Sequence, residues 1–251
     1  MNITASIQAR MGSTRLPGKV LKSINDKPML LWQIDRIKRS RLIDNIIVAT
    51  SNSELDNEIV ELCIENEIQY FRGSENDVLA RVANLLEIND VDIHVECYGD
   101  SPLIDPQLID ESIGIYFKYK DQADYFSSSI KTTFPPGLEF SIYDASILVN
   151  VNRRISADDP LREHVGFNIT RFEDYKIFSI EAPPSLQKPE LYLEVDTKED
   201  FELINIVINH FISIKKLNFS AYDLVEFFEK NPELSHINNK VERRWKKLRN
   251  D

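Results

Sequence analysis

Short apolar runs alternate with longer amphipathic segments through the first 120 residues of the chain. The apolar runs predict buried strands, and they cover residues 3–7, 45–50, 69–71 and 91–98. After each run, apolar residues return at the spacing of one helix face, as Leu30, Ile34 and Ile37 do after Pro28. Four such repeats predict an α/β fold, with a mostly parallel sheet and helices on both of its faces.

The second half of the chain is less regular. Extended pieces are expected at residues 125–128, 138–142, 176–181 and 191–195, and helices at 197–208, 220–230 and 241–249. The last of these helices is basic, and we interpret its charged run as a solvated face. Since the sequence contains neither an internal repeat nor a low-complexity linker, we expect one domain over residues 1–251 with a smaller lobe.

A cationic loop follows the first predicted strand. Its sequence, Q-A-R-M-G-S-T-R-L-P-G-K at residues 8–19, places Arg10, Arg15 and Lys19 beside two glycines. Glycine lets backbone N–H groups approach a ligand, and Arg and Lys supply charge to phosphate oxygens. Its spacing is neither that of a P-loop nor that of a dinucleotide fingerprint. A solvated turn is the alternative, but three cations exceed what a turn requires, so the loop predicts a nucleotide phosphate site.

The overall composition sets this loop apart. A net charge of −11 and a pI near 5.0 argue against a general binder of nucleic acid or of anionic membranes. Cys63 and Cys97 lie in apolar stretches and are expected to be small buried hydrophobic residues. There is no apolar run of the roughly 18 residues that span a membrane and no signal peptide before Ile3, so we expect a cytoplasmic protein without membrane insertion.

Two aspartates end predicted strands. Asp100 follows Gly99 after the strand at 91–98, and Asp196 follows the extended piece at 191–195. Because the loops after parallel strands share one edge of the sheet, Asp100 should lie near the cationic loop. Carboxylates beside phosphates are suited to hold Mg²⁺. The alternative for each aspartate is a helix or turn cap.

Several motifs together carry a family resemblance. They are A-R-M-G-S-T-R-L-P-G-K, F-R-G-S-E-N-D-V-L-A-R, G-D-S-P-L-I-D-P, P-G-L-E, R-E-H-V, V-D-T-K-E-D-F and N-P-E-L, in this order along nearly the whole chain. In these motifs the chain resembles the cytidylyltransferases that make CMP-activated sugars, the CMP-Kdo and CMP-sialic-acid-type synthetases. It is most similar to the branch named for the spore coat polysaccharide biosynthesis protein F.

The resemblance implies a Rossmann-like, glycosyltransferase-A-like nucleotidyltransferase that acts in surface polysaccharide biosynthesis. A sugar oxygen would attack the α-phosphorus of CTP and release pyrophosphate, and the expected acceptor is a 2-keto sugar acid. The implied organisation is a nucleotide-binding half at 1–120, an acceptor and dimerisation lobe at about 121–190, and a last core strand with helices at 191–251. A homodimer is expected from the resemblance alone.

The resemblance also implies roles for individual residues. Catalysis would fall to Arg10, Lys19, Asp100 and Asp196, the two aspartates being the Mg²⁺ ligands. The implied nucleotide-binding residues are Gln8, Ala9, Arg10, Gly12, Ser13, Arg15, Lys19, Arg72, Ser74, Asp77 and Gly99, with Arg81 as a further candidate. The candidates for acceptor binding are Glu139, Arg162, Glu163 and His164.

Three questions stay open at the level of sequence. The general base is Asp196, a metal-bound water or His164, although His164 also suits a structural hydrogen bond. The nucleotide base and the acceptor depend on the loop at 72–81 and on the middle of the chain, so another nucleotide or a non-sugar acceptor is an alternative. A non-catalytic subunit that binds a nucleotide sugar is the alternative from another class.

Overall fold

The computed structural model describes residues 1–246 of the chain. Its strands are β1 (Ile3–Gln8), β2 (Ser23–Ile24), β3 (Lys27–Pro28), β4 (Asn45–Ser51), β5 (Gln69–Gly73), β6 (Ile93–Tyr98), β7 (Tyr125–Ser127), β8 (Phe140–Asp144) and β9 (Ile177–Ser179). Its α-helices are α1 (Met29–Ile37), α2 (Asn57–Glu65), α3 (Val78–Ile88), α4 (Pro106–Tyr119), α5 (Ala145–Arg154), α6 (Lys198–Ser213) and α7 (Ala221–Lys230).

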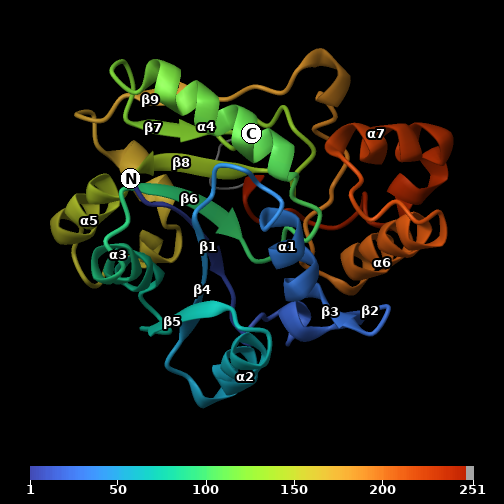
Figure 1. The fold of residues 1–251 in the computed structure, drawn as a ribbon, viewed down its shortest axis with the longest axis horizontal. Helices are drawn as coiled ribbons and strands as arrows, with labels where there is room; N and C mark the ends of the chain where they lie inside the picture. Colours follow the sequence, from blue (N-terminus) through green and yellow to red (C-terminus); the bar gives the residue numbers. More distant parts are fainter. Residues whose placement is uncertain (247–251) are drawn as a thin grey trace.

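A seven-stranded sheet runs through the molecule in the order β5-β4-β1-β6-β8-β7-β9 (Figure 1). The pairs of β1 with β4 and β6, and of β4 with β5, are parallel. β8 is antiparallel to both of its neighbours, and β9 pairs in parallel with β7. The predicted α/β fold with a mostly parallel sheet is therefore confirmed. The carboxyl ends of β1, β4, β5 and β6 meet at one edge, where the loops after these strands lie.

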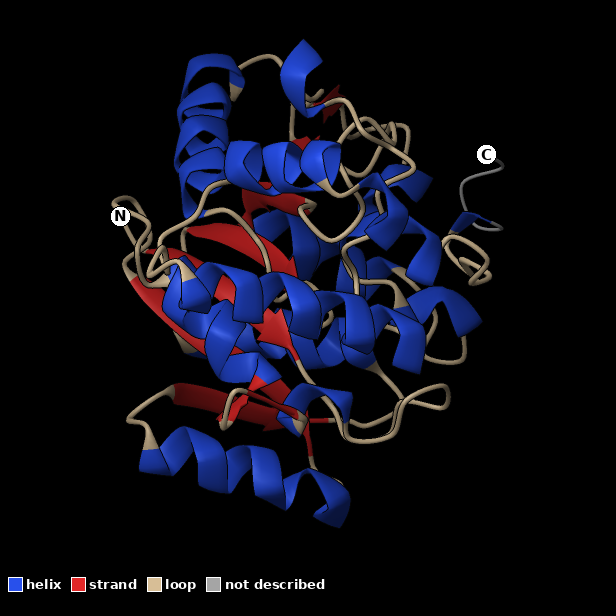
Figure 2. Cartoon of the chain, turned by 90° about the vertical axis from the view of Figure 1, so that its right-hand side faces the viewer, coloured by secondary structure: helices blue, strands red, loops and turns tan. Residues whose placement is uncertain are grey.

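Each face of the sheet has its own hydrophobic core, because successive strand residues point to opposite faces. Ile47 and Ala49 of β4 belong to the core formed with α3 and α5, whereas Val48 belongs to the core formed with α1, α4, α6 and α7. The same alternation separates Tyr125 from Phe126 in β7. Figure 1 shows α3 beside α5, and Figure 2 shows the twisted stack of strands with helices alongside it.

Two expectations for the second half of the chain were wrong, and one helix was missed. Residues 191–195 are extended but form no strand, since the N–H groups of Leu193 and Val195 bond to the carbonyls of Pro136 and Asp100 instead of to a ladder. Helix α5 was not foreseen from the sequence. Residues 241–245 form a bend and a turn rather than a helix, and residue 246 is helical. Residues 247–249 of that predicted helix lie outside the described residues.

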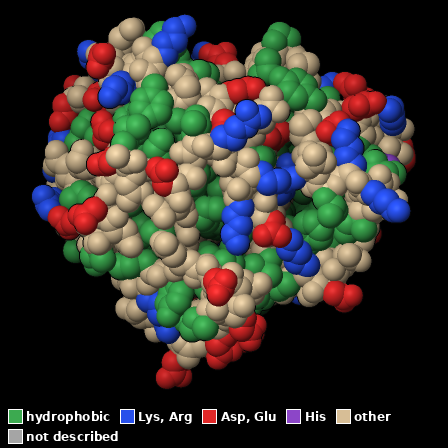
Figure 3. Space-filling model, viewed as in Figure 1, with side chains coloured by type: hydrophobic (Ala, Val, Ile, Leu, Met, Phe, Trp, Pro, Cys, Tyr) green, Lys and Arg blue, Asp and Glu red, His purple; other side chains and the backbone are tan. Residues whose placement is uncertain are grey.

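The surface and the thiols agree with the composition. Basic and acidic side chains are interspersed on the face drawn in Figure 3. Cys63 and Cys97 are free and buried, as expected, and burial raises the pKa of the Cys63 thiol to about 11. Within residues 1–246, no helix combines the length and the apolarity that crossing a bilayer requires.

The buried side chain of His94 makes the stability of the fold depend on pH. Its ring is fully buried, contacts the Ser6 hydroxyl at 2.7 Å and packs edge-on against Tyr143. Burial lowers the pKa of His94 to about 3. Because the unfolded chain binds this proton more readily than the folded chain does, stability is full above about pH 6.5 and falls as the pH drops toward 3, by about 1.4 kcal/mol per unit.

We therefore expect His94→Gln to flatten the loss of stability between pH 6.5 and 4.5, which in the native protein amounts to about 3 kcal/mol from this group. Urea unfolding at several pH values measures the slope. His236→Gln, which alters an exposed histidine, serves as the control. A slope in the His94 variant as steep as in the native protein would contradict the assignment.

Candidate active site

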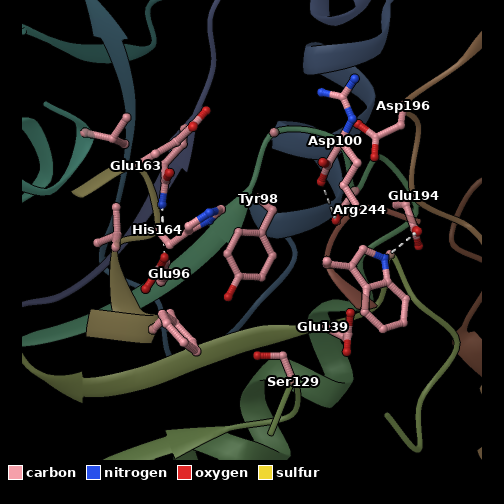
Figure 4. A pocket seen from close by; sticks show the side chains of 18 of the residues that line it. Glu96, Tyr98, Asp100, Ser129, Glu139, Glu163, His164, Glu194, Asp196 and Arg244 are labelled. Carbon is pink, nitrogen blue, oxygen red and sulfur yellow. Dashed lines mark hydrogen bonds between the residues drawn. The ribbon is translucent and has the colours of Figure 1, made fainter. Parts of the chain in front are cut away.

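A cavity of about 1070 Å³ lies at the carboxyl ends of β1 and β6. Its walls are the loop after β1, the end of β6, residues 137–139 before β8, the 3₁₀ turns between residues 160 and 171, and residues 194–196 and 244–245. Figure 4 shows Asp100, Asp196, Glu194 and Arg244 on one side of Tyr98. Glu96, Glu163 and His164 lie on the other side.

Lys19 brings the two predicted metal aspartates together. Its ammonium donates to Asp196 Oδ1 at 3.0 Å and to the Val195 carbonyl at 2.7 Å, and it lies 3.5 Å from Asp100 Oδ2. Arg15 Nη2 holds the other oxygen of Asp196 at 2.6 Å. Two cations from the first loop thus face two carboxylates, one after β6 and the other before α6.

The charges in this group differ in how well they are stabilised. Burial raises the pKa of Asp100, and repulsion from Asp196 adds to the rise against the attraction of Lys19. Burial also acts to raise the pKa of Asp196, but Lys19 and Arg15 outweigh it and hold the pKa below its usual range. Burial also disfavours the charged form of Lys19, but the attraction of the two carboxylates outweighs burial and raises the pKa of Lys19. Asp100 therefore gains most from an additional cation.

Asp200 fixes the backbone on which Asp196 stands. Its fully buried carboxylate accepts hydrogen bonds from the N–H groups of Asp196 at 3.0 Å and Thr197 at 2.9 Å. Asp200 is the third helical residue after the N-cap Thr197, and the two form a capping box at the start of α6. The other Asp200 oxygen accepts from Asn238 and Arg243, both at 2.8 Å. A helix cap and a buried ion pair thus share one carboxylate.

Two glycines allow backbones to meet at the floor of the cavity. A Cβ at Gly99 would lie 2.1 Å from the Gln8 carbonyl oxygen, so the ends of β1 and β6 can approach only with glycine there. Gly137 has φ of +101°, and a Cβ at this position would lie 2.4 Å from the backbone nitrogen of Glu194. These contacts place Asp100 beside the first loop and Glu139 beside residue 194.

The structure brings most predicted residues of the first loop to the cavity. Those that line it are Gln8, Ala9, Arg10, Ser13, Arg15 and Lys19, together with Gly99 and Asp100 from the end of β6 and Asp196. Gly12 does not line the cavity and is exposed. Arg10 forms an ion pair with Glu163 at 2.6 Å, which joins the loop to the predicted acceptor residues.

Three other predicted residues take structural positions instead. Arg72 donates to the carbonyls of Ser51 and Ser53, and Asp77 caps α3 through the Ala80 N–H. Ser74 does not line the cavity; its carbonyl accepts from Arg81, which does line it.

Arg162 is a correction of the same kind. It is 5% exposed, pairs with Asp77 at 2.9 Å and bonds to the Ile155 carbonyl, so its charge is used within the fold and does not reach the cavity. Of the predicted acceptor residues, Glu139, Glu163 and His164 do line the cavity.

Sequence reasoning missed further lining residues, among them Glu96, Tyr98, Glu194, Arg244 and Trp245. Glu96 is 1% exposed and accepts from Gln8, Tyr143 and the Gly166 N–H, and its burial raises the pKa. A carboxylate inside the apolar run at 91–98 was a signal that could have identified it. Glu194 accepts from the Trp245 indole at 3.0 Å, and burial raises the pKa of Glu194 to about 7.

The carboxylates also bear on the predicted metal. No cluster of three or more His, Cys, Asp or Glu side chains able to hold a metal was found among residues 1–246. Asp100 and Asp196 form a pair, both within 3.5 Å of one ammonium. Two carboxylates facing a nucleotide loop fit Mg²⁺, which takes one or two carboxylates and completes its shell with phosphate oxygens and water.

Comparison with known proteins gives the family. Residues 4–230 match the model of the cytidylyltransferase family. The spore coat polysaccharide biosynthesis protein SpsF of Bacillus subtilis is 32% identical over 90% of this chain and 94% of its own length. The structure of a cytidylyltransferase from Leptospira borgpetersenii superposes with a TM-score of 0.86 at 31% identity, covering 97% of this chain and 99% of that one.

A 3-deoxy-manno-octulosonate cytidylyltransferase of Pelobacter propionicus is 39% identical over 45% of this chain and 44% of its own. The chain therefore belongs to the cytidylyltransferase family. Its predicted class, a nucleotidyltransferase enzyme, is confirmed.

The double use of Asp200 makes a testable prediction. We expect Asp200→Ala to lower the free energy of unfolding by about 3 to 5 kcal/mol, because it removes the nearer carboxylate of the buried Arg243 and leaves only Glu194, at 3.4 Å, to pair with it. Asp223 occupies the matching capping-box position of α7, where its ion-pair partner Lys216 is exposed. Asp223→Ala should cost about 1 kcal/mol, the value of a cap. Urea denaturation compares the two variants, and equal losses would refute the role assigned to the buried pair.

Proposed function

We propose that the enzyme transfers CMP from CTP to a sugar and releases pyrophosphate. The convergence of Asp100, Asp196, Lys19 and Arg15 at one edge of the sheet carries this proposal. The reaction asks a protein mainly for positioning and for neutralisation of charge on the phosphates. The cavity is large enough for a nucleotide together with a sugar, since ligand sites of this kind measure about 300 to 1,000 Å³.

In this proposal the acceptor hydroxyl attacks the α-phosphorus, the bond from the α-phosphorus to the bridging oxygen breaks, and pyrophosphate leaves. Arg10, Ser13 and Lys19 bind phosphate oxygens, and Arg15 keeps Asp196 ionised and in place. Asp100 and Asp196 are the ligands of Mg²⁺. When bound, Mg²⁺ would neutralise charge on the phosphates.

His164 is our candidate for the proton acceptor. It lines the cavity and faces it in Figure 4, and burial lowers its pKa against the opposing effect of Glu163. A neutral imidazole can accept the proton of the attacking hydroxyl. Asp196, the other side-chain candidate, is a weaker base, because Lys19 and Arg15 hold its pKa below the usual range.

We further propose a 2-keto sugar acid as the acceptor, in a homodimeric cytoplasmic enzyme of surface polysaccharide biosynthesis. The name of the Bacillus subtilis relative and that of the 3-deoxy-manno-octulosonate cytidylyltransferase support this choice. Glu139, Glu194 and Trp245 line one part of the cavity, and carboxylates beside an aromatic ring suit the hydroxyls and the C–H face of a sugar.

The central test is pyrophosphate release from CTP and Mg²⁺ with a panel of 2-keto sugar acids and other bacterial surface sugars. Asp100→Asn should reduce the rate by about 100- to 1,000-fold, because it removes a charge that positions the metal and the phosphates. Asp121→Asn, at an exposed aspartate, is the control. Greater thermal stabilisation by UTP, GTP or ATP than by CTP would sink the cytidine assignment. Full activity of the Asp100 variant would sink the metal role.

His164 is tested by the pH dependence of kcat. The native rate should fall at acid pH with a midpoint below the ordinary histidine pKa of about 6.5, because burial lowers the pKa of His164 and a protonated imidazole cannot accept a proton. His164→Gln should lower kcat by about 100-fold and remove this acid limb. A variant that keeps the acid limb, even with a lower rate, would show that another group is the base.

A further inference from the structure

The basic segment at residues 242–246, which follows α7, forms part of the cavity wall. The sequence suggested a solvated helix face for these cations, yet the Arg243 side chain is 1% exposed. Its neighbours Arg244 and Trp245 line the cavity. We define residues 242–246 as the C-terminal strap.

The strap is anchored by contacts with several segments of the chain. Arg243 donates to Asp200 at 2.8 Å and to the Asn238 carbonyl at 3.2 Å. Trp245 donates to Glu194, and Lys246 donates to the Tyr192 hydroxyl at 2.8 Å. Arg15 of the first loop donates to the Glu242 carbonyl at 3.2 Å. Four of the five strap residues are therefore held in place, either through the side chain or through the backbone.

Arg244, the remaining strap residue, differs from the other cations of the cavity. Lys19 and Arg15 are paired with aspartates, Arg10 is paired with Glu163, and Arg81 donates to the Ser74 carbonyl. Within residues 1–246, Arg244 has no hydrogen bond or ion pair, and its side chain is exposed. In Figure 4 it lies on the same side of Tyr98 as Asp100 and Asp196.

The charge balance around these aspartates calls for a further cation. Lys19 and Arg15 supply two positive charges, and Asp100 and Asp196 supply two negative charges, so the four side chains together are neutral. A nucleoside triphosphate brings several negative charges to this place. A planar guanidinium with all of its donors free is the group best suited to bind them.

We propose that Arg244 binds the terminal phosphates of the nucleotide, the part that leaves as pyrophosphate, and that Arg243 is a positioning residue for the strap. This inference rests on the proposed function for the identity of the nucleotide, but not for the phosphate contact itself. Arg243 and the backbone of Asp196 share the carboxylate of Asp200, so one buried group positions both the strap and Asp196.

The test is calorimetric binding of CTP, pyrophosphate and CMP in the presence of Mg²⁺. We expect Arg244→Ala to weaken CTP and pyrophosphate by about 10- to 100-fold, which corresponds to the loss of one or two hydrogen bonds to a charged group. CMP, which lacks the terminal phosphates, should bind with nearly its native affinity. Arg244→Lys should recover part of the loss, because it restores charge without the fork.

Lys240→Ala is the matched control, because it removes the same charge from an exposed position just before the strap and should leave all three affinities unchanged. Native affinity of the Arg244→Ala variant for CTP and pyrophosphate would overturn the inference, and so would an equal loss for CMP. If the native protein binds ATP or UTP in place of CTP and the Arg244 variant loses that affinity, the cytidine assignment fails and the inference stands. Failure of the native protein to bind pyrophosphate or any nucleotide would overturn both.

Discussion

Two carboxylates that share a site repel one another, and Lys19 offsets this repulsion between Asp100 and Asp196. Asp100 and Asp196 arrive from separate segments, and their meeting is stable only because a single ammonium contacts both and Arg15 holds one of them. The first loop therefore has two roles. It presents cations to the cavity, and it is also the counter-charge that lets the far segment approach the end of β6.

A second constraint comes from the carboxylate of Asp200, which does not line the cavity. Asp200 is completely buried, and its five donors come from the turn before α6, from Asn238 and from Arg243. Such a carboxylate tolerates burial only while all of these donors are present. The turn that carries Asp196 and the strap that carries Arg244 are for this reason parts of one polar network, although more than 40 residues separate them in the sequence.

The sequence predicted the half of the fold whose signals are local. Apolar runs followed by amphipathic segments identified β1, β4, β5 and β6, and the glycine-bearing cationic loop after β1 was recognised by its composition. The loop residues and both aspartates do meet at the cavity. The prediction failed where a residue is defined by a distant partner. Arg243 looked like part of a solvated run because Asp200 and Glu194 cannot be recognised as its partners from spacing alone.

Arg162 was misjudged for the same reason, since Asp77 lies 85 positions earlier in the chain. Residues 191–195 have the alternation of a strand, but their N–H groups are taken by two separate loops. Hydrophobic periodicity predicts which face of an element a side chain occupies. It does not predict which carbonyl group the backbone N–H of that residue will bond to. Glu96 is different, because a carboxylate within a buried strand was visible in the sequence and was overlooked.

The hydrogen bond from Arg15 to the Glu242 carbonyl spans 227 positions, and it has a consequence for how the enzyme is made. The parallel half of the sheet is complete once β6 has been synthesised, so a nascent chain can assemble that half early. The cavity wall needs residues 242–246, which follow the end of β6 by more than 140 positions. A growing chain would thus pass through a stage in which the sheet is formed but its site is not, and a protein shortened before residue 242 would be held at that stage.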